Sequence, residues 1–272
     1  FVPEFLRRGL KQPLHLALSY DEEVGCIGVH RLIGDILARG VAPAGCIVGE
    51  PTGMQVVVAH KGKKAWRCRV RGFEAHSSLT PQGVNAVQIA CELVAFLTQK
   101  ARAFRDRGGF DDAYDVPFTT VHTGVIRGGT AVNIIPRDCQ FDFEIRHLPF
   151  DDPDQFFAEV RAHAETFLPD MHRVAPDTWI EFDPLSSLPG FDTGGDSAIA
   201  ALGHQCNGAH DHGKVSFGTE ASLFHNAGVP TIICGPGHIA QAHQPNEWVA
   251  VEQLARCEAF MRRLANRICL PE

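Results

Sequence analysis

The chain has 272 residues, of which 44% are hydrophobic, and its formal net charge is −7. This length fits one large domain or two ordinary ones, with enough apolar residues for a sizeable core. The negative charge and the lack of a basic tract argue against nucleic acid as a partner. No apolar run reaches the ~18 residues of a membrane-spanning helix, so no membrane contact is expected. Nine scattered cysteines without a Cys-x-x-Cys pair are typical of reduced thiols in a cytoplasmic protein, with structural zinc or disulfides as alternatives.

The first 60 residues predict a strand, a helix and a second strand. Residues 14–20 are mostly apolar, as in a strand that is covered on both faces. Residues 25–39 have helical spacing, with Ile27, Leu32, Ile33, Ile36 and Leu37 as the apolar stripe. The second strand lies in "AGCIVGEPTG" and ends in a Pro-Gly loop. This order predicts a parallel α/β sheet.

From residue 61 the pattern becomes that of a half-exposed antiparallel strand. The segments that follow are a helix over about 83–105, strands over 118–126 and 138–147, a helix from Pro153, and the strand "TWIEFDP". The order β-α-β-β-α-β predicts a ferredoxin-like α+β unit.

From about residue 186 the α/β pattern returns. Its segments are the helix "DSAIAALGH", a strand near "KVSF", the helix "TEASLFHNAG", the strand "VPTIICGPG" and a helix over 249–268. The sequence therefore predicts an α/β catalytic domain formed by residues 1–60 and 186–272. A smaller α+β domain, residues 61–185, interrupts it.

Acidic or histidine-bearing loops follow three predicted strands of the α/β domain. They are "SYDEEVG", "VGEPTG" and "GPGHIAQAHQPNE". In open α/β sheets, ligands bind beyond the carboxyl ends of the strands. Of two adjacent acids, one can ligate a metal while the other acts as a general base, and a carboxylate and a histidine from other loops would complete a site for Zn²⁺, Co²⁺ or Mn²⁺. Each of these signals taken singly also fits a solvated loop.

Six segments carry a more specific resemblance: "ALSYDEEVGC", "CIVGEPTG", "KGKKAWRCRVRGFEAHSS", "TAVNIIPRDCQFDFEIRHLP", "SFGTEASLFHNAGVPTIICGPG" and "AQAHQPNEWV". In this order, over about residues 10–268, they resemble the acetylornithine deacetylase family of the di-zinc aminoacylase/carboxypeptidase G2-like superfamily. The resemblance implies a cytoplasmic homodimer, joined through the α+β lid domain, that deacetylates N-acetyl-L-ornithine in arginine biosynthesis. It implies two Zn²⁺ per complete subunit, which Co²⁺ can replace. A succinyl-diaminopimelate desuccinylase and a metallo-carboxypeptidase or dipeptidase are the alternatives within the superfamily.

The resemblance also implies roles for the residues of the metal site. Glu22 would be the general base, Glu23 would ligate one zinc together with His243, and Glu50 would ligate the other. These roles are chemically sound, because a carboxylate beside a zinc-activated water can accept its proton and pass it to the leaving amine. Asp21 is expected to cap the following turn or to orient a ligand.

In the lid, the resemblance implies that His76 of the partner subunit binds the amide oxygen as charge develops on it. Asn133 and Arg146 would hold the substrate carboxylate, for which a guanidinium offers a planar fork. The residues alone leave other interpretations open. Arg146 could pair with Glu144, and Asn133 could satisfy backbone groups in a Gly-rich turn.

The family pattern also contains a His-x-Asp motif and a Gly-x-x-Asp-Met-Lys-Gly string, and this sequence has neither. We therefore expect that the first third of the catalytic domain is missing, that the metal site is incomplete and that the chain as given is inactive. A non-catalytic dimerising relic is the alternative from another class. The string "GAHDHG", with His210, Asp211 and His212, looks like a metal site but falls in a Gly-rich loop where the family has no ligand.

Overall fold

A computed structural model describes residues 1–242 and 244–270 of the chain. The chain forms two compact units, and each is described by itself. The discontinuous unit consists of Phe1–His60 and Gly190–Glu272, and the inserted unit is Lys61–Pro189. The sequence placed the second boundary between residues 185 and 186, but the last strand of the inserted unit, β6 (Trp179–Leu188), continues past that point.

The inserted unit is a four-stranded antiparallel sheet with helices. Its strands lie in the order β4-β5-β3-β6. Its elements in chain order are β3 (Gly62–Arg71), the 3₁₀ helix η1 (Ser77–Gln82), α3 (Ala86–Asp106), β4 (Thr120–Gly128), β5 (Asp138–His147), α4 (Pro153–Glu165), α5 (Leu168–Val174) and β6. Apart from η1 and α5, this is the β-α-β-β-α-β order of the ferredoxin-like unit that the sequence predicts.

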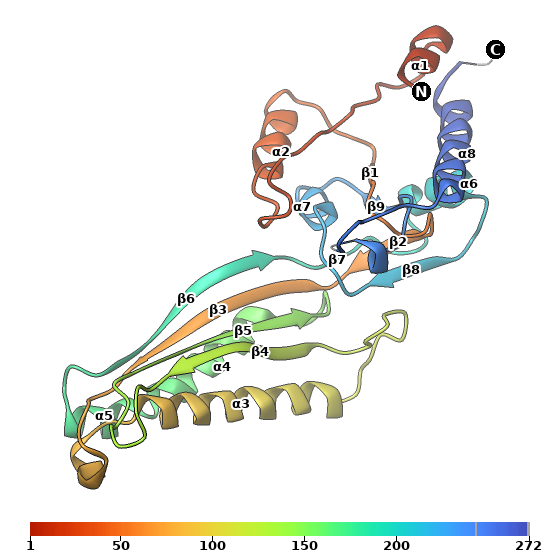
Figure 1. The fold of residues 1–272 in the computed structure, drawn as a ribbon. Helices are drawn as coiled ribbons and strands as arrows, with labels where there is room; N and C mark the ends of the chain where they lie inside the picture. Colours follow the sequence, from red (N-terminus) through yellow and green to blue (C-terminus); the bar gives the residue numbers. More distant parts are fainter. Residues whose placement is uncertain (243, 271–272) are drawn as a thin grey trace. The chain divides into compact units, whose positions relative to one another are not determined.

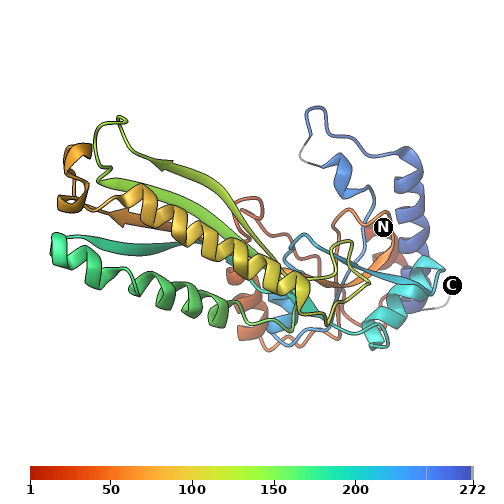
Figure 2. The ribbon, with the colours of Figure 1, turned by 90° about the horizontal axis from the view of Figure 1, so that it is seen from below.

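One face of this sheet is apolar and the other is charged, because side chains alternate between the faces of a strand. Trp66 of β3 is buried between the rings of Phe143, 5.5 Å away, and Phe157 of α4, 4.5 Å away. Figures 1 and 2 show α3 and α4 on the same face of the sheet. On the opposite face, cross-strand ion pairs join the strands, such as Arg67 with Asp142 at 2.8 Å.

The discontinuous unit contains a mixed sheet. Its elements are α1 (Val2–Arg8), α2 (Val29–Ala38), β1 (Cys46–Val48), β2 (Val56–His60), β7 (Phe191–Asp192), α6 (Ala198–Asn207), β8 (His212–Val215), α7 (Ala221–Asn226), β9 (Thr231–Ile233), η2 (Ile239–Gln241) and α8 (Val251–Ile268). The expected parallel pairing occurs between β1 and β9 and between β2 and β8. However, β2 pairs antiparallel with β7 and β9. Sequence reasoning did not identify β2, a short apolar run that is buried at all five positions.

The strand predicted over residues 14–20 is wrong. These residues are irregular, and Leu16 and Leu18 are 67% and 86% exposed. No strand of the described residues pairs with this segment, so its backbone has no ladder of hydrogen bonds, whatever its apolar composition. The following helix, α2, buries Val29 and Ile33, whereas Ile27 and Leu37 of the predicted stripe are exposed.

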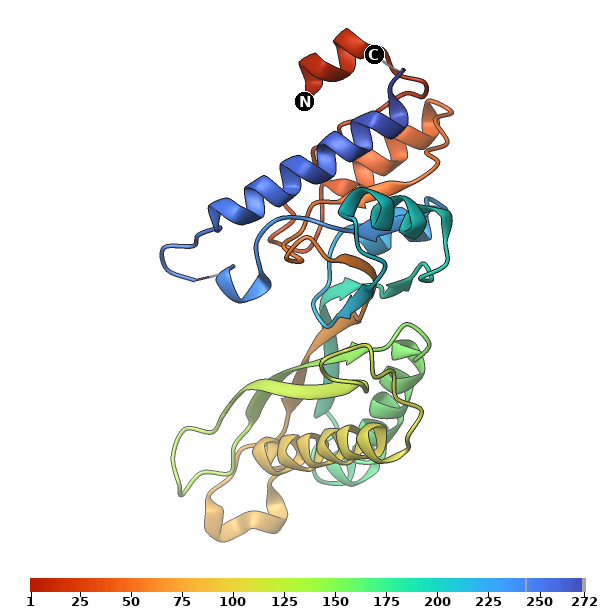
Figure 3. The ribbon, with the colours of Figure 1, turned by 90° about the vertical axis from the view of Figure 1, so that its right-hand side faces the viewer.

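The N-terminal helix α1 packs beside the C-terminal end of α8 (Figure 3). Phe5 is buried there with Ala265 and Cys269, and the amide of Leu270 donates to the carbonyl of Gly9 at 3.0 Å. Among the described residues, no helix combines the length and the apolar character that crossing a membrane requires.

The core of the inserted unit gives a direct test of this packing. Phe141 is fully buried and Phe150 is 63% exposed. Phe141→Ala should lower the free energy of unfolding by about 3–5 kcal/mol, because it removes a large ring and leaves a cavity. The matched control Phe150→Ala should change it by less than about 0.5 kcal/mol. Urea unfolding measures both, and equal effects would show that Phe141 is not in the core.

Candidate active site

The parallel pair β1–β9 brings two loops together at one edge of the sheet. Val48 is opposite Ile233, so Glu50 and Gly235, each two residues further on, emerge side by side. A Cβ on Gly235 would lie 2.5 Å from the carbonyl oxygen of Glu50, a distance that real Cβ atoms do not show. Glycine therefore permits the close approach of the two loops. The arrangement matches the expected position of a ligand site in an α/β sheet.

The loop that carries Glu22 and Glu23 has an unusual backbone. Asp21 and Cys26 adopt left-handed conformations with φ of 56° and 57°. This region is uncommon for residues other than glycine and is often found at functional sites. The amide of Cys26 donates to the carbonyl of Glu22 at 2.9 Å, which closes the turn. The carboxylate of Asp21 makes no hydrogen bond with residues 1–242 or 244–270, so the expected side-chain cap is not formed.

Cys26 is buried next to the loop that carries the acidic pair. Its thiol is 3% exposed and lies 3.6 Å from Oε1 of Glu22. Burial is the main reason that the pKa of Cys26 is raised to about 12, and the negative charges of Glu22, Glu220 and Glu50 raise it further. Of the three carboxylates, that of Glu22 contacts the thiol directly. Glu23, by contrast, is exposed.

Glu220 is the member of this group that sequence reasoning missed. It immediately precedes α7, and only 8% of the residue is exposed. The hydroxyl of Ser19 donates to Oε2 of Glu220 at 2.7 Å, while Oε1 is buried without a hydrogen-bond partner among the described residues. Burial, and then the charge of Glu22, raise the pKa of Glu220. The available signal was its place in "GTEASLF", one of the segments that carry the resemblance.

The chemistry of this group fits a divalent cation. Carboxylate oxygens are ligands for Zn²⁺ and similar ions, and a buried carboxylate oxygen without a partner is stabilised by a positive charge. The fourth predicted residue, His243, lies outside the described residues. As the side chains stand, no three His, Cys, Asp or Glu of the described residues are arranged to hold a metal ion. The assignment of Glu23, Glu50 and His243 as ligands is therefore a proposal.

The "GAHDHG" segment brings together more imidazoles than the sequence indicated. The ring of His204 in α6 is buried and lies 5.8 Å from the ring of His212 and 6.4 Å from that of His210. Burial, followed by the two neighbouring histidines, lowers the pKa of His204. This cluster too falls short of a metal-binding arrangement in the described structure.

In the inserted unit, the structure places His76 and Asn133 next to each other. His76 forms a backbone bridge with Ile134, and the amide of Ser77 donates to the carbonyl of Asn133 at 3.0 Å. Nδ1 of His76 accepts the amide of Ser78 at 3.2 Å. In a neutral imidazole this leaves the proton on Nε2, so that exposed His76 presents a hydrogen-bond donor.

Arg146 lies at the opposite end of β5 from Asn133. Asn133 precedes the first residue of the strand, Asp138, and Asp138 and Arg146 are eight residues apart, which at a rise of ~3.3 Å places them about 26 Å from each other. Asn133 and Arg146 of one chain therefore cannot hold the same carboxylate. Arg146 pairs instead with Glu144, its Nε lying 3.0 Å from Oε1, which is the alternative that the sequence left open.

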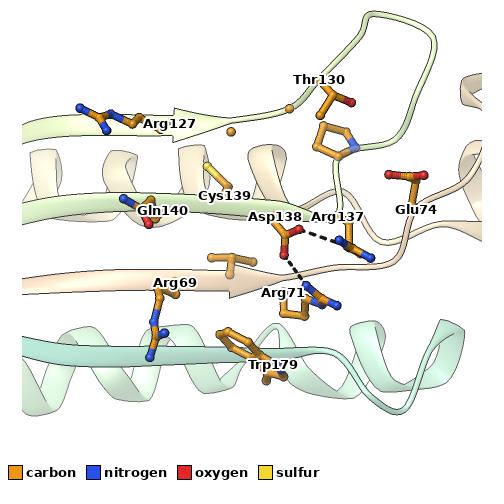
Figure 4. A pocket seen from close by; sticks show the side chains of 14 residues that line it. Arg69, Arg71, Glu74, Arg127, Thr130, Arg137, Asp138, Cys139, Gln140 and Trp179 are labelled. Atoms are coloured by element: carbon orange, nitrogen blue, oxygen red, sulfur yellow. Dashed lines mark hydrogen bonds and ion pairs between the residues drawn. The ribbon is translucent and has the colours of Figure 1, made fainter.

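A cavity of about 610 Å³ opens on the charged face of the inserted unit (Figure 4). Four arginines line it: Arg69, Arg71, Arg127 and Arg137. Arg71 and Arg137 both bind the carboxylate of Asp138, at 2.8 and 3.1 Å. None of the residues predicted for the active site lines this cavity, so it is a separate feature of the sheet.

Comparison with known proteins relates these features to a family. Residues 58–172 match the peptidase dimerisation domain of the M20 type. The chain is 35% identical over 260 residues to the acetylornithine deacetylase of Myxococcus xanthus, covering 96% of this chain and 66% of the relative. The chain belongs to the M20 peptidase family. A second M20 relative, the acetylornithine deacetylase of Proteus mirabilis, is 30% identical over 97% of this chain and 65% of its own length.

Solved structures show the same fold. The aminopeptidase PepT of Bacillus cereus matches with a TM-score of 0.72 and 21% identity, over 90% of this chain and 62% of its own. The dipeptidase Dug1p of Saccharomyces cerevisiae matches with a TM-score of 0.60 and 13% identity, over 89% of this chain and 63% of its own. Such distant identities establish the M20 fold alone. The chain spans about two thirds of the length of the relatives that it matches.

The raised pKa of Cys26 predicts slow alkylation. At pH 7.5, a thiol with a pKa of about 12 reacts about a thousand-fold more slowly than one with the usual pKa of about 8.5, because only the thiolate is nucleophilic. Iodoacetamide labelling followed by peptide mass spectrometry should therefore modify exposed Cys91 long before Cys26. Glu22→Gln should speed the labelling of Cys26, whereas Glu23→Gln should not. Equal rates at Cys26 and Cys91 would contradict this description of the site.

Proposed function

We propose that this protein is a metal-dependent amidohydrolase that removes the acetyl group from N-acetyl-L-ornithine. The observation that carries the proposal is the hydrogen bond of Ser19 to buried Glu220, which ties the loop of Glu22 and Glu23 to a second acid, in a member of the M20 family. The charges of Glu22, Glu220 and Glu50 all raise the pKa of Cys26 in this unit. The substrate is inferred from the names of its relatives. Nine free thiols fit a reducing compartment, and we place the enzyme in the cytoplasm.

In this proposal the residues of the discontinuous unit have separate roles in proton transfer and in metal binding. Bound zinc, replaceable by cobalt, lowers the pKa of water to about 7. Glu22, half-buried beside Cys26, accepts the proton and returns it to the leaving amine. Glu23, Glu50 and His243 hold the metal. The two adjacent acids have different surroundings, as two different roles require: Glu22 is half-buried beside Cys26, whereas Glu23 is exposed.

The inserted unit supplies the remaining groups, and its geometry favours a homodimer. His76 and Asn133 share one corner, whereas Arg146 lies at the far end of β5. A second copy of the chain would allow both ends to contribute to one active site. His76 then stabilises the developing oxyanion in the active site of the partner. The edge strand β4 exposes Val125 and Ile126 and is suited to an isologous contact.

The two acids should respond differently to mutation. Glu22→Gln should leave zinc binding intact and lower turnover of N-acetyl-L-ornithine by about 10²–10⁴-fold, because it removes a general base. Glu23→Gln should lose zinc, because an amide is a poorer ligand than a carboxylate. Turnover is measured on the complete product of the gene, and zinc by metal analysis. For the chain described here we expect less than two equivalents of zinc, since the His-x-Asp and Asp-Met-Lys strings are absent.

The controls separate the alternatives. If both variants keep their zinc and near-normal turnover, the acidic pair is a solvated loop. If Glu22→Gln loses zinc and Glu23→Gln keeps it, the two roles are reversed. If N-succinyl-diaminopimelate or a dipeptide is hydrolysed faster than N-acetyl-L-ornithine, the proposed metal centre stands and the assigned substrate is wrong. A protein that binds zinc at neither acid would fit the non-catalytic relic.

The proposed dimer has its own test. Light scattering of the 29.7 kDa chain should give about twice that mass. Ile126→Lys, on the exposed edge of β4, should shift the mass toward the monomer, because it buries a charge at the contact. Leu185→Lys, an equally exposed position on the other edge strand β6, is the matched control. A wild-type monomer at high concentration, or disruption by the β6 variant alone, would contradict a contact through β4.

A further inference from the structure

Glu220 combines features that a structural acid does not need. Only 8% of the residue is exposed, and its Oε1 has no hydrogen-bond partner among residues 1–242 and 244–270. Buried polar atoms are nearly always hydrogen-bonded, and a buried carboxylate is especially costly when it is not compensated. The hydroxyl of Ser19 supplies one hydrogen bond, to Oε2. The other oxygen has no partner among the described residues, and the charge of Glu22 is one of the influences that raise the pKa of Glu220, after burial.

The backbone that carries Glu220 is held rigidly. Thr219 and Ser222 on either side of it are buried. The amide of Ala221 donates to the hydroxyl of Thr219 at 3.1 Å, and the ring of His60 in β2 contacts Thr219 at 3.1 Å. A side chain mounted on such a support has few ways to move toward solvent. The unpartnered oxygen is therefore a fixed feature of the site.

Ser19 connects the backbone around Glu220 to the loop that carries Glu22 and Glu23. It precedes Glu22 by three residues in a segment that forms no strand, so pairing within the sheet does not hold the loop in place. The Ser19–Glu220 hydrogen bond crosses 201 residues of sequence and ties this segment to the start of α7. A ligand-bearing loop needs such support, because misplaced ligands weaken metal binding.

We propose that Glu220 is a positioning residue of the metal centre. Its Oε2 holds Ser19 in the loop that carries Glu22 and Glu23, and its unpartnered Oε1 would be compensated by the charge of the bound cation. This inference rests on the proposed metal centre and adds to it a carboxylate that is contributed by α7. The positive charge of the cation compensates the buried carboxylate, and the carboxylate in turn raises the affinity of the site for the cation.

The test is zinc affinity, measured on the complete product of the gene by competition with a chromophoric chelator, because the metal site of the chain described here is expected to be incomplete. Glu220→Gln should weaken zinc binding by about 10–100-fold, the usual effect of removing a group that supports metal ligands. Ser19→Ala should weaken it less, because it leaves the carboxylate in place. Glu23→Gln reports on the proposed ligand set itself. Glu252→Gln, an exposed acid in the first turn of α8, makes the same change of charge within the same unit and should have no effect.

Thermal unfolding distinguishes positioning from a purely structural role. Without metal, Glu220→Gln should leave the unfolding temperature unchanged or raise it, because a neutral amide costs less to bury than a carboxylate. With saturating zinc, the rise in unfolding temperature should be smaller than in the wild type at the same zinc concentration, since stabilisation follows affinity. A lower unfolding temperature without metal, together with wild-type zinc affinity, would assign Glu220 a structural role and overturn the inference.

The outcomes also separate this inference from the proposed function. If Glu23→Gln weakens zinc binding and Glu220→Gln does not, the metal centre stands and the role of Glu220 is refuted. If the complete wild-type product of the gene binds no zinc, both the proposed centre and the inference fail. If Glu220→Gln and Ser19→Ala both weaken binding while Glu252→Gln does not, the connection from α7 to the catalytic loop is established.

Discussion

The parallel pairing of β1 with β9 is the constraint on which the candidate site depends. It places the ends of two short strands, 185 residues apart in sequence at Val48 and Ile233, at the same edge of one sheet. The loops beyond them then approach so closely that only glycine fits at residue 235. Glu50 is thereby fixed at this edge, and β2 and α7 bring Glu220 to the same region. The carboxylates converge because of the sheet topology, although they are distant in sequence.

The second unit can be inserted into the chain without disrupting this sheet because its first and last strands are neighbours. Its first strand, β3, and its last, β6, are neighbours, with Lys63 opposite Leu188. The chain therefore leaves after His60 and returns at Gly190 from adjacent positions. A domain whose ends lie close together can be inserted without separating the strands on either side of it. The inserted unit has its own core, centred on Trp66 and Phe141, and does not depend on the interrupted sheet for its packing.

The sequence predicted those parts of the fold that local patterns determine. The ferredoxin-like order follows from long alternating strands and a long amphipathic helix, each identifiable within about 20 residues. The failures were non-local. Residues 14–20 have the composition of a buried strand but lack a partner strand among the described residues, and β2 is too short and too uniformly apolar to be told from a loop or a helical turn. Strand pairing determines the structure of both segments, and the sequence of neither segment identifies its pairing partner.

The same distinction applies to the site. Glu22, Glu23 and Glu50 could be chosen from sequence because they lie in loops after apolar runs, next to turn-forming residues. For Glu220 the only sequence signal was its place in a segment that carries the resemblance, because the position before a helix is an ordinary place for an acid. Its significance comes from burial and from an unpartnered oxygen.

Local rules are broken together in this one region: two left-handed residues that are not glycine, a buried thiol among carboxylates and a buried acid with one bond. The buried carboxylate is unfavourable in the chain alone, and a positive charge near it would compensate this cost, but not the backbone strain of the two left-handed residues. The proposed cation site would need this arrangement, since the fold must hold like charges together before the ion binds.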